Sequence, residues 1–260
     1  MIDNEKYRFG SASWSQQDDL RRAGMFEKKG LQIGYYKNQP IYLETDAPII
    51  TIAGAGSGKL RDLLAMAVAQ NAGGRNFILD PRGEISVVTM INFAIAKAFL
   101  NRWNPTGMHS QHGQRMNPLD ILKFNSPTFH ADCKFIAKSL IPTIGSGDGR
   151  YFELRAQEWL ENIIKMLVEK DGVVTFPTFY RVINWIESDS SRWADYLEYM
   201  LNSSLDSVRR TAGEMLAKQQ DAPREFGSII GEIYAYLNFL DDPMLQASLE
   251  NADASLADTC

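Results

Sequence analysis

The sequence predicts an α/β domain joined to an all-α domain. A short β-branched run at residues 49–52 leads into a glycine-rich loop, which a helix follows at once. A second apolar run at residues 76–79 follows that helix, so we expect a strand–helix–strand unit with parallel strands. From about Ser126 onward, apolar residues recur almost continuously with the 3.6-residue period of helices. These patterns assign residues 48–125 to a partial nucleotide-binding domain and residues 126–245 to an all-α domain.

Residues 1–47 form a polar, turn-rich segment ahead of the first predicted strand. A short helix is expected at residues 16–23, because acidic residues near its start and basic residues near its end complement the helix dipole. Two extended stretches, at residues 31–36 and 40–43, predict a hairpin that precedes the glycine-rich loop.

The loop between the first strand and its helix carries the most specific chemical signal. Glycines allow successive backbone N–H groups to turn toward one point, and the helix that follows adds the positive end of its dipole. Lys59 can then reach the terminal phosphates of a nucleotide. The alternative is a flexible glycine-rich turn, but the flanking strand and helix favour a phosphate-binding loop. The candidate nucleotide-binding residues are Gly54, Ala55, Gly56, Ser57, Gly58, Lys59 and Leu60.

Two positions depart from the usual pattern of such loops. Ala53 replaces the first glycine, which is a mild change if this residue is not at positive φ. Leu60 stands where a Ser or Thr hydroxyl normally ligates Mg²⁺, and a leucine side chain offers no ligand atom. A bound Mg²⁺ would therefore have to use water, the nucleotide and a carboxylate from elsewhere.

The second predicted strand ends in the acidic turn of residues 80–84. The carboxyl end of a parallel strand lies on the same sheet edge as the phosphate loop, so Asp80 or Glu84 is expected to face the nucleotide or its metal. A Pro-Gly turn with a helix-capping acid explains the same residues equally well. Both alternatives stay open.

The helical half has amphipathic segments whose aromatic residues are expected to belong to the core. The Gly-rich residues 145–150 lie between two of these helices, and we expect a mobile loop there, not a second phosphate site. Helices are expected at residues 60–70, 85–100, 128–141, 151–170, 176–187, 190–202, 205–220 and 225–240.

Composition narrows the class of protein. The net charge of −5 does not favour binding to nucleic acid by bulk electrostatics. Cys133 and Cys260 have no metal-ligand spacing, His109 and His112 lie in a polar loop, and so no metal site is expected. The chain has no signal peptide and no apolar run long enough to span a bilayer, which predicts a cytoplasmic location.

Five motifs together resemble one family. The chain is similar to the TraG/TraD-type coupling proteins, the ATPases of conjugative and type IV secretion systems, from about residue 9 to residue 258. The motifs are residues 10–14 (Gly-Ser-Ala-Ser-Trp), the phosphate loop, residues 80–84 (Asp-Pro-Arg-Gly-Glu), residues 117–120 (Asn-Pro-Leu-Asp) and residues 151–153 (Tyr-Phe-Glu).

The resemblance implies a RecA-like P-loop NTPase domain interrupted by an all-α domain. It also implies ATP with Mg²⁺ as cofactors, a hexameric ring, and partners that include a relaxase–DNA complex or secreted effector and other type IV secretion components. Residues 246–260 are then expected to return toward the motor domain, and partners would bring the protein to the inner membrane.

Three departures from the family qualify this expectation. Transmembrane helices usually begin family members and are absent here, and Arg82 replaces a more usual lysine. The sequence also stops before the strand with the acidic Walker B pair, so we expect incomplete hydrolytic machinery, a truncated motor and a hexamer only with the missing half.

Two functions remain as hypotheses from the sequence. The first is a coupling-protein ATPase that binds ATP and helps to recruit or translocate a DNA–protein substrate. The alternative is a non-catalytic adaptor that binds a relaxase or effector through its helical domain. An unrelated nucleotide kinase is disfavoured, because the sequence lacks a lid-like arginine cluster.

Overall fold

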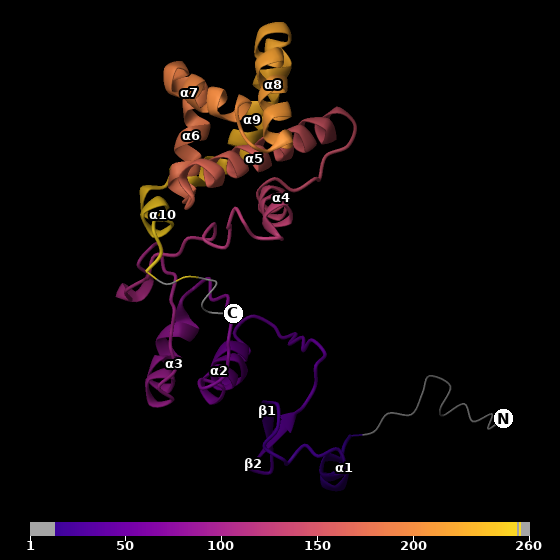
Figure 1. Cartoon of the computed structure of the whole chain (residues 1–260). Helices are drawn as coiled ribbons and strands as arrows, with labels where there is room; N and C mark the ends of the chain where they lie inside the picture. Colours follow the sequence, from indigo (N-terminus) through magenta and orange to yellow (C-terminus); the bar gives the residue numbers. More distant parts are fainter. Residues whose placement is uncertain (1–13, 254, 256–260) are drawn as a thin grey trace, which may run out of the picture. The chain divides into compact units, whose positions relative to one another are not determined.

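The computed structural model describes residues 14–253 and residue 255 of the chain (Figure 1). It divides into two compact units, Met1–Leu100 and Asn101–Cys260. Most of the motif at residues 10–14 lies outside the described residues, as does Cys260, while Trp14 is described and exposed. Each unit is therefore considered separately.

The first unit begins with the predicted short helix and hairpin, and both are confirmed. Strands β1 and β2 pair antiparallel, with Leu31 opposite Leu43 and Tyr36 opposite Gln39. Lys37 and Asn38 form the turn with φ values of 46° and 65°, the left-handed conformation that suits a two-residue hairpin. The elements of this unit are α1 (Gln17–Arg22), β1 (Leu31–Tyr36), β2 (Gln39–Leu43), the π-helix η2 (Lys59–Leu64), α2 (Ala65–Gln70) and α3 (Glu84–Ile95).

The two predicted parallel strands are wrong in this structure. Residues 49–52 and 76–79 pair with no other strand, and in the described part of the chain the sheet consists of β1 and β2. Their side chains are largely exposed, with Ile50 at 81% and Phe77 at 97%. A β-branched sequence favours extended backbone, but a strand also needs a neighbour to satisfy its N–H and C=O groups.

The helix after the glycine-rich loop begins as a π-helix. The predicted single helix at residues 60–70 consists of η2 followed directly by α2. Helix α3 packs against α2 and buries Ile85, Thr89 and Phe93. It ends at Ile95, five residues before the predicted end, and Lys97 then adopts a φ of 51°.

The second unit is helical, as the sequence predicts. Each predicted helix from residue 128 onward is present, with boundaries shifted by at most a few residues. The elements are the 3₁₀-helix η3 (Met108–Ser110), α4 (Phe129–Leu140), α5 (Asp148–Asp171), α6 (Phe176–Ser188), α7 (Ser190–Leu201), α8 (Asp206–Asp221), α9 (Pro223–Leu237), the 3₁₀-helix η4 (Asn238–Asp241) and α10 (Pro243–Ser248).

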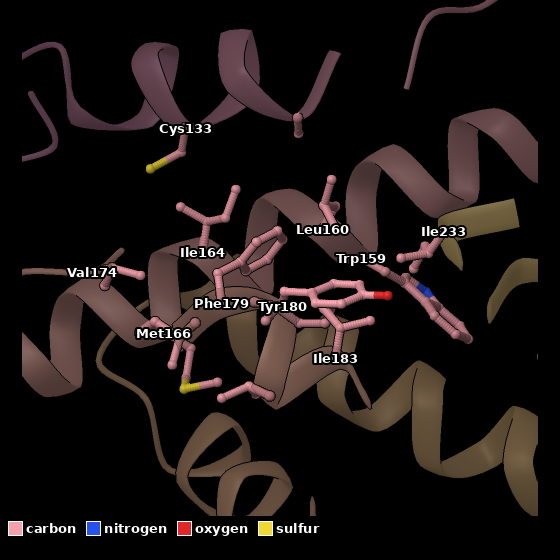
Figure 2. Close-up of a cluster of buried hydrophobic side chains, with 14 of the residues drawn as sticks. Cys133, Trp159, Leu160, Ile164, Met166, Val174, Phe179, Tyr180, Ile183 and Ile233 are labelled. Carbon is pink, nitrogen blue, oxygen red and sulfur yellow. The ribbon is translucent and has the colours of Figure 1, made fainter. Parts of the chain in front are cut away.

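Helix α5 forms the centre of this unit. It contacts α4, α7, α8 and α9, and its residues Trp159, Leu160 and Ile164 are fully buried. Figure 2 shows these side chains clustered with Phe179 of α6. The expectation that the aromatic residues belong to the core is confirmed for Trp159, Phe179 and Trp193, while Phe135 and Phe239 are exposed, at 69% and 47%. Cys133 is also enclosed, and burial raises the pKa of its thiol to about 12.

Residues 101–125 pack with the helical unit. Leu119 and Leu122 belong to the same hydrophobic core as α4 and α5. The backbone N–H of Met116 donates to the carbonyl of Ser248, and the Arg115 guanidinium pairs with Asp253 at 2.7 Å. The segment before α4 is thus hydrogen-bonded to α10 and to the residues that follow it. The sequence groups residues 101–125 with the predicted nucleotide-binding domain, whereas the structure divides the chain into compact units after Leu100. The functional domain boundaries at residues 47, 125 and 245 stay predictions.

Candidate functional site

The glycine-rich loop adopts backbone conformations that only some of its residues tolerate. Gly56 and Gly58 have φ values of 73° and 83°, where a side chain would strain the backbone. Ala53 is not at positive φ, so it meets the condition under which its replacement of the first glycine is mild. The glycines therefore stand where the turn requires them.

Lys59 folds back across this loop. Its Nζ donates to the carbonyl oxygens of Gly54, at 3.1 Å, and Ala53, at 3.4 Å. The ammonium group and the loop backbone are brought together, although the side chain is exposed. An anion that reached the loop would exchange weak hydrogen bonds to neutral carbonyls for charge-assisted ones.

Asp62 places a carboxylate beside the loop, and the sequence analysis did not identify it. Its backbone N–H donates to the Gly58 carbonyl at 2.7 Å. A β-carbon at position 58 would lie 2.3 Å from Asp62 Oδ2, which shows how close this carboxylate comes to the Gly58 backbone. Hydrogen bonds from Arg61, at 2.6 and 2.9 Å, lower the pKa of the Asp62 carboxyl. The sequence feature that could have pointed to Asp62 is the presence of an acidic residue within one helical turn of Lys59.

Asp80 caps a helix in this structure. Its Oδ2 accepts a hydrogen bond from the backbone N–H of Ser86 at 2.9 Å, and its carbonyl accepts one from Gly83 at 3.0 Å. Gly83 has a φ of 68°, and α3 begins at the next residue, Glu84. This geometry matches the Pro-Gly turn with a capping acid. Among the described residues, neither Asp80 nor Glu84 is joined to the loop of residues 53–60 by a hydrogen bond or ion pair.

The residues present fit a nucleotide phosphate better than a protein-built magnesium site. Two left-handed glycines and Lys59 provide a flexible turn and a positive charge for phosphate. Leu60 provides no oxygen ligand, and no group of three or more His, Cys, Asp or Glu side chains within the described residues could hold a metal ion. The loop is thus a candidate for phosphate, with Mg²⁺ left to water and nucleotide ligands.

The second glycine-rich loop has the opposite electrostatic character. Glu153, only 4% exposed, accepts hydrogen bonds from the backbone N–H groups of Ile144, at 3.1 Å, and Gly145, at 2.9 Å. A carboxylate already occupies the N–H groups that an anion would use. This supports the expectation that residues 145–150 are not a second phosphate site.

Two other motifs of the sequence make structural links within the helical unit. Asn117 Nδ2 donates to the carbonyl of Val174 at 2.8 Å, and its Oδ1 accepts from the N–H of Leu119 at 3.1 Å. The hydroxyl of Tyr151 donates to Glu225 of α9 at 2.6 Å. The sequence singled out these residues without indicating such roles.

No helix within the described residues is both long enough and apolar enough to cross a membrane.

Comparison with known proteins gives two consistent matches. The family described as "Type IV secretory system Conjugative DNA transfer" matches residues 13–259. The chain is also 22% identical to the "Conjugal transfer protein TraG" of Escherichia coli over 277 aligned residues. That alignment covers 95% of this chain and 42% of the relative, so the chain spans less than half of the relative's length.

Proposed function

This chain belongs to the type IV secretory family of conjugative DNA-transfer proteins, and from this membership we propose that it acts as a coupling-protein ATPase. In this role it binds ATP at residues 54–60 of a RecA-like P-loop domain and helps to recruit or translocate a DNA–protein substrate. The single observation that carries the proposal is the loop in which Gly56 and Gly58 turn the backbone and Lys59 lies across it.

The chemistry of this loop supports nucleotide binding in two ways. Within the described part of the chain, the hydrogen bonds of Lys59 go to carbonyl oxygens alone, so its charge is available to phosphate oxygens, which accept stronger hydrogen bonds from an ammonium group. Gly56 leaves room for the backbone to approach a phosphate closely, because no heavy atom beyond its two chain neighbours lies within 4 Å of where its β-carbon would stand. Bound ATP would supply the free energy of phosphoryl transfer, while the chain's own loop binds and orients the phosphates.

The proposed partners follow from the same membership. They are a relaxase–DNA complex or a secreted effector, other type IV secretion components at the inner membrane, and further copies of the protein in a ring. The helical unit has its own extensive core and many surface-exposed helix faces, which suits a unit that binds other proteins.

Titration with a fluorescent ATP analogue carrying a methylanthraniloyl group tests the nucleotide site. We expect Lys59→Ala to weaken binding by about tenfold or more, because the ammonium group is lost from the loop. Lys28→Ala removes an exposed charge from the same unit and is the matched control, with affinity expected within about twofold of the unchanged chain. Equal affinity of the Lys59→Ala chain and the unchanged chain would contradict the proposal.

The adaptor remains a second candidate, because two observations favour it. Leu60 gives Mg²⁺ no ligand, and the Asp62 carboxylate beside Gly58 repels phosphate. An adaptor would bind its protein partner equally well with or without ATP, and Lys59→Ala would not affect that binding. Absence of nucleotide binding by the unchanged chain, with partner binding intact, would favour the adaptor.

A further inference from the structure

The helical unit contains a polar groove apart from the phosphate loop. It has a volume of about 420 Å³ and lies where α5 contacts both α4 and α8, helices that Figure 1 shows beside it. Side chains of α4 form one wall, α8 forms the other, and α5 forms the floor. Lys134 and Lys138 line it from α4, Asn162 from α5 and Arg210 from α8.

The acids of this groove are already paired. Glu158 binds Arg155 at 3.1 Å and lies 3.7 Å from Arg210, while Glu161 binds the buried Lys165 at 2.5 Å. Arg155 also pairs with Glu214 at 3.1 Å. These charges therefore neutralise one another within the fold.

Two lysines of α4 remain as unneutralised charges. Lys134 and Lys138 stand one helical turn apart, both exposed, and neither forms a hydrogen bond or ion pair with any residue in the described part of the chain. The wall they form is positively charged. It therefore attracts a ligand with negative groups spaced along its length.

The floor adds a second requirement on the ligand. Asn162 is only 1% exposed, and its Nδ2 donates to the Glu158 carbonyl, at 2.9 Å, and to Thr211 Oγ1, at 3.0 Å. Its Oδ1 is buried and receives no hydrogen bond from the described residues. A buried acceptor without a donor is unfavourable, so this atom calls for an N–H group.

We propose that this groove binds an acidic peptide segment of a partner protein. Carboxylates of the segment would pair with Lys134 and Lys138, a backbone N–H would reach Asn162, and an apolar side chain would cover Leu154, which is 44% exposed. A peptide has a backbone N–H donor at every non-proline residue, whereas the N–H donors of a nucleic acid are confined to its bases, so a short peptide segment places a donor close to its anionic groups more readily. This inference rests on the proposed function of the helical unit and adds the class of peptide that it binds.

Fluorescence anisotropy with the full chain tests the groove. The probe is a decapeptide of alternating Glu and Ala, labelled with tetramethylrhodamine, whose own charges cancel, and amidated at its C-terminus, so that the Glu side chains alone give it a net negative charge. We expect saturable binding that weakens as salt is raised, and a loss of about tenfold or more in affinity for Lys134→Glu/Lys138→Glu. A peptide with Lys in place of Glu is expected not to bind.

A matched variant separates the groove from the overall charge. Lys123→Glu/Arg181→Glu changes the net charge of the helical unit by the same amount at exposed residues outside the groove, and we expect its affinity to stay within about twofold. Circular dichroism melting curves check that both variants fold. Equal losses in both variants, or no binding by the unchanged chain, would overturn the proposal.

Two further measurements distinguish a peptide from a nucleic acid as the ligand and test the groove independently of the nucleotide site. Competition by a single-stranded oligonucleotide of equal net charge is expected to be weaker than competition by unlabelled peptide, and equal competition would overturn the peptide assignment. Lys59→Ala should keep peptide binding, and Lys134→Glu/Lys138→Glu should keep binding of the ATP analogue. If the unchanged chain bound the acidic peptide but not the ATP analogue, the proposal of a coupling-protein ATPase would be contradicted and the proposal of a peptide-binding groove would not.

Discussion

Large apolar side chains are mostly exposed on either side of the glycine-rich loop and its helix, and mostly enclosed in the helical unit. Ile50 and Phe77, before and after the loop and its helix, are 81% and 97% exposed. Trp159 and Phe179, of α5 and α6, are fully buried. The two regions have similarly apolar sequences, so hydrophobicity alone does not explain the difference.

The difference lies in where each kind of element finds its hydrogen bonds. A helix satisfies its backbone N–H and C=O groups within its own sequence, and α5 needs its neighbours only to cover its side chains. A strand needs another strand for its backbone hydrogen bonds, and only the sheet that forms in this way can be covered by helices on its faces. Residues 49–52 and 76–79 pair with no strand in the described part of the chain, so their apolar side chains contribute little to stability here.

Truncating one phenylalanine in each region tests this comparison most strongly. We expect Phe179→Ala to lower the free energy of unfolding of the helical unit by about 4 kcal/mol, because it leaves a cavity in a closely packed core. Phe77→Ala is expected to change the free energy of unfolding of its own unit, Met1–Leu100, by no more than about 0.5 kcal/mol, because the ring is solvated. Urea unfolding followed by circular dichroism at the helix band measures both.

The two variants also show how the comparison could fail. A loss for Phe77→Ala as large as that for Phe179→Ala would mean that the segment around Phe77 is packed in solution. The comparison between exposed and enclosed regions would then be wrong.

Neutralising the acid of the second glycine-rich loop sharpens the contrast between the two loops. We expect Glu153→Gln to destabilise the helical unit by about 2 kcal/mol, because charge-assisted hydrogen bonds to Ile144 and Gly145 are weakened in a buried place. Urea unfolding measures the loss, and Glu187→Gln, at an exposed position, is the control with almost no expected effect. Equal stability of both variants would show that Glu153 does not anchor the loop.

The smallest expected effect concerns the link between the two ends of the helical unit. Hydrogen bonds from Arg115 lower the pKa of the Asp253 carboxyl from 3.8 to about 2. Because the folded pKa lies below the unfolded value, the stabilisation is complete well above pH 3.8 and is lost as the pH falls toward 2. The pair is exposed, so its contribution is small. An NMR titration of the Asp253 carboxyl carbon should give a midpoint near 2.

Replacing the partner provides the control for that titration. In Arg115→Gln the midpoint should rise toward 3.8. An unchanged midpoint would mean that Arg115 does not hold the carboxylate in solution.

Much of the candidate site could be predicted from the sequence, because its signal is local. Gly56, Gly58 and Lys59 lie within four consecutive residues, and their spacing alone indicates a turn with a positive charge. Asp80 was correctly noticed, but whether it caps α3 or faces a nucleotide depended on three-dimensional geometry, and only its capping bond to Ser86 is present. Asp62 and Glu153 were missed in these roles, because acids in amphipathic helices are ordinarily solvated.

The sequence by itself determined the positions of most of the helices, the β1–β2 hairpin and the glycine-rich loop, while α10 was not predicted from it. Helical periodicity, turn residues and capping act over a few neighbouring residues, so one chain segment contains the whole signal. Only the tertiary structure decided which apolar runs are enclosed, that Glu153 holds a loop, and that Lys134 and Lys138 border a groove over Asn162. Burial, strand pairing and charge clusters depend on residues far apart in the chain, and no local pattern records which of them meet.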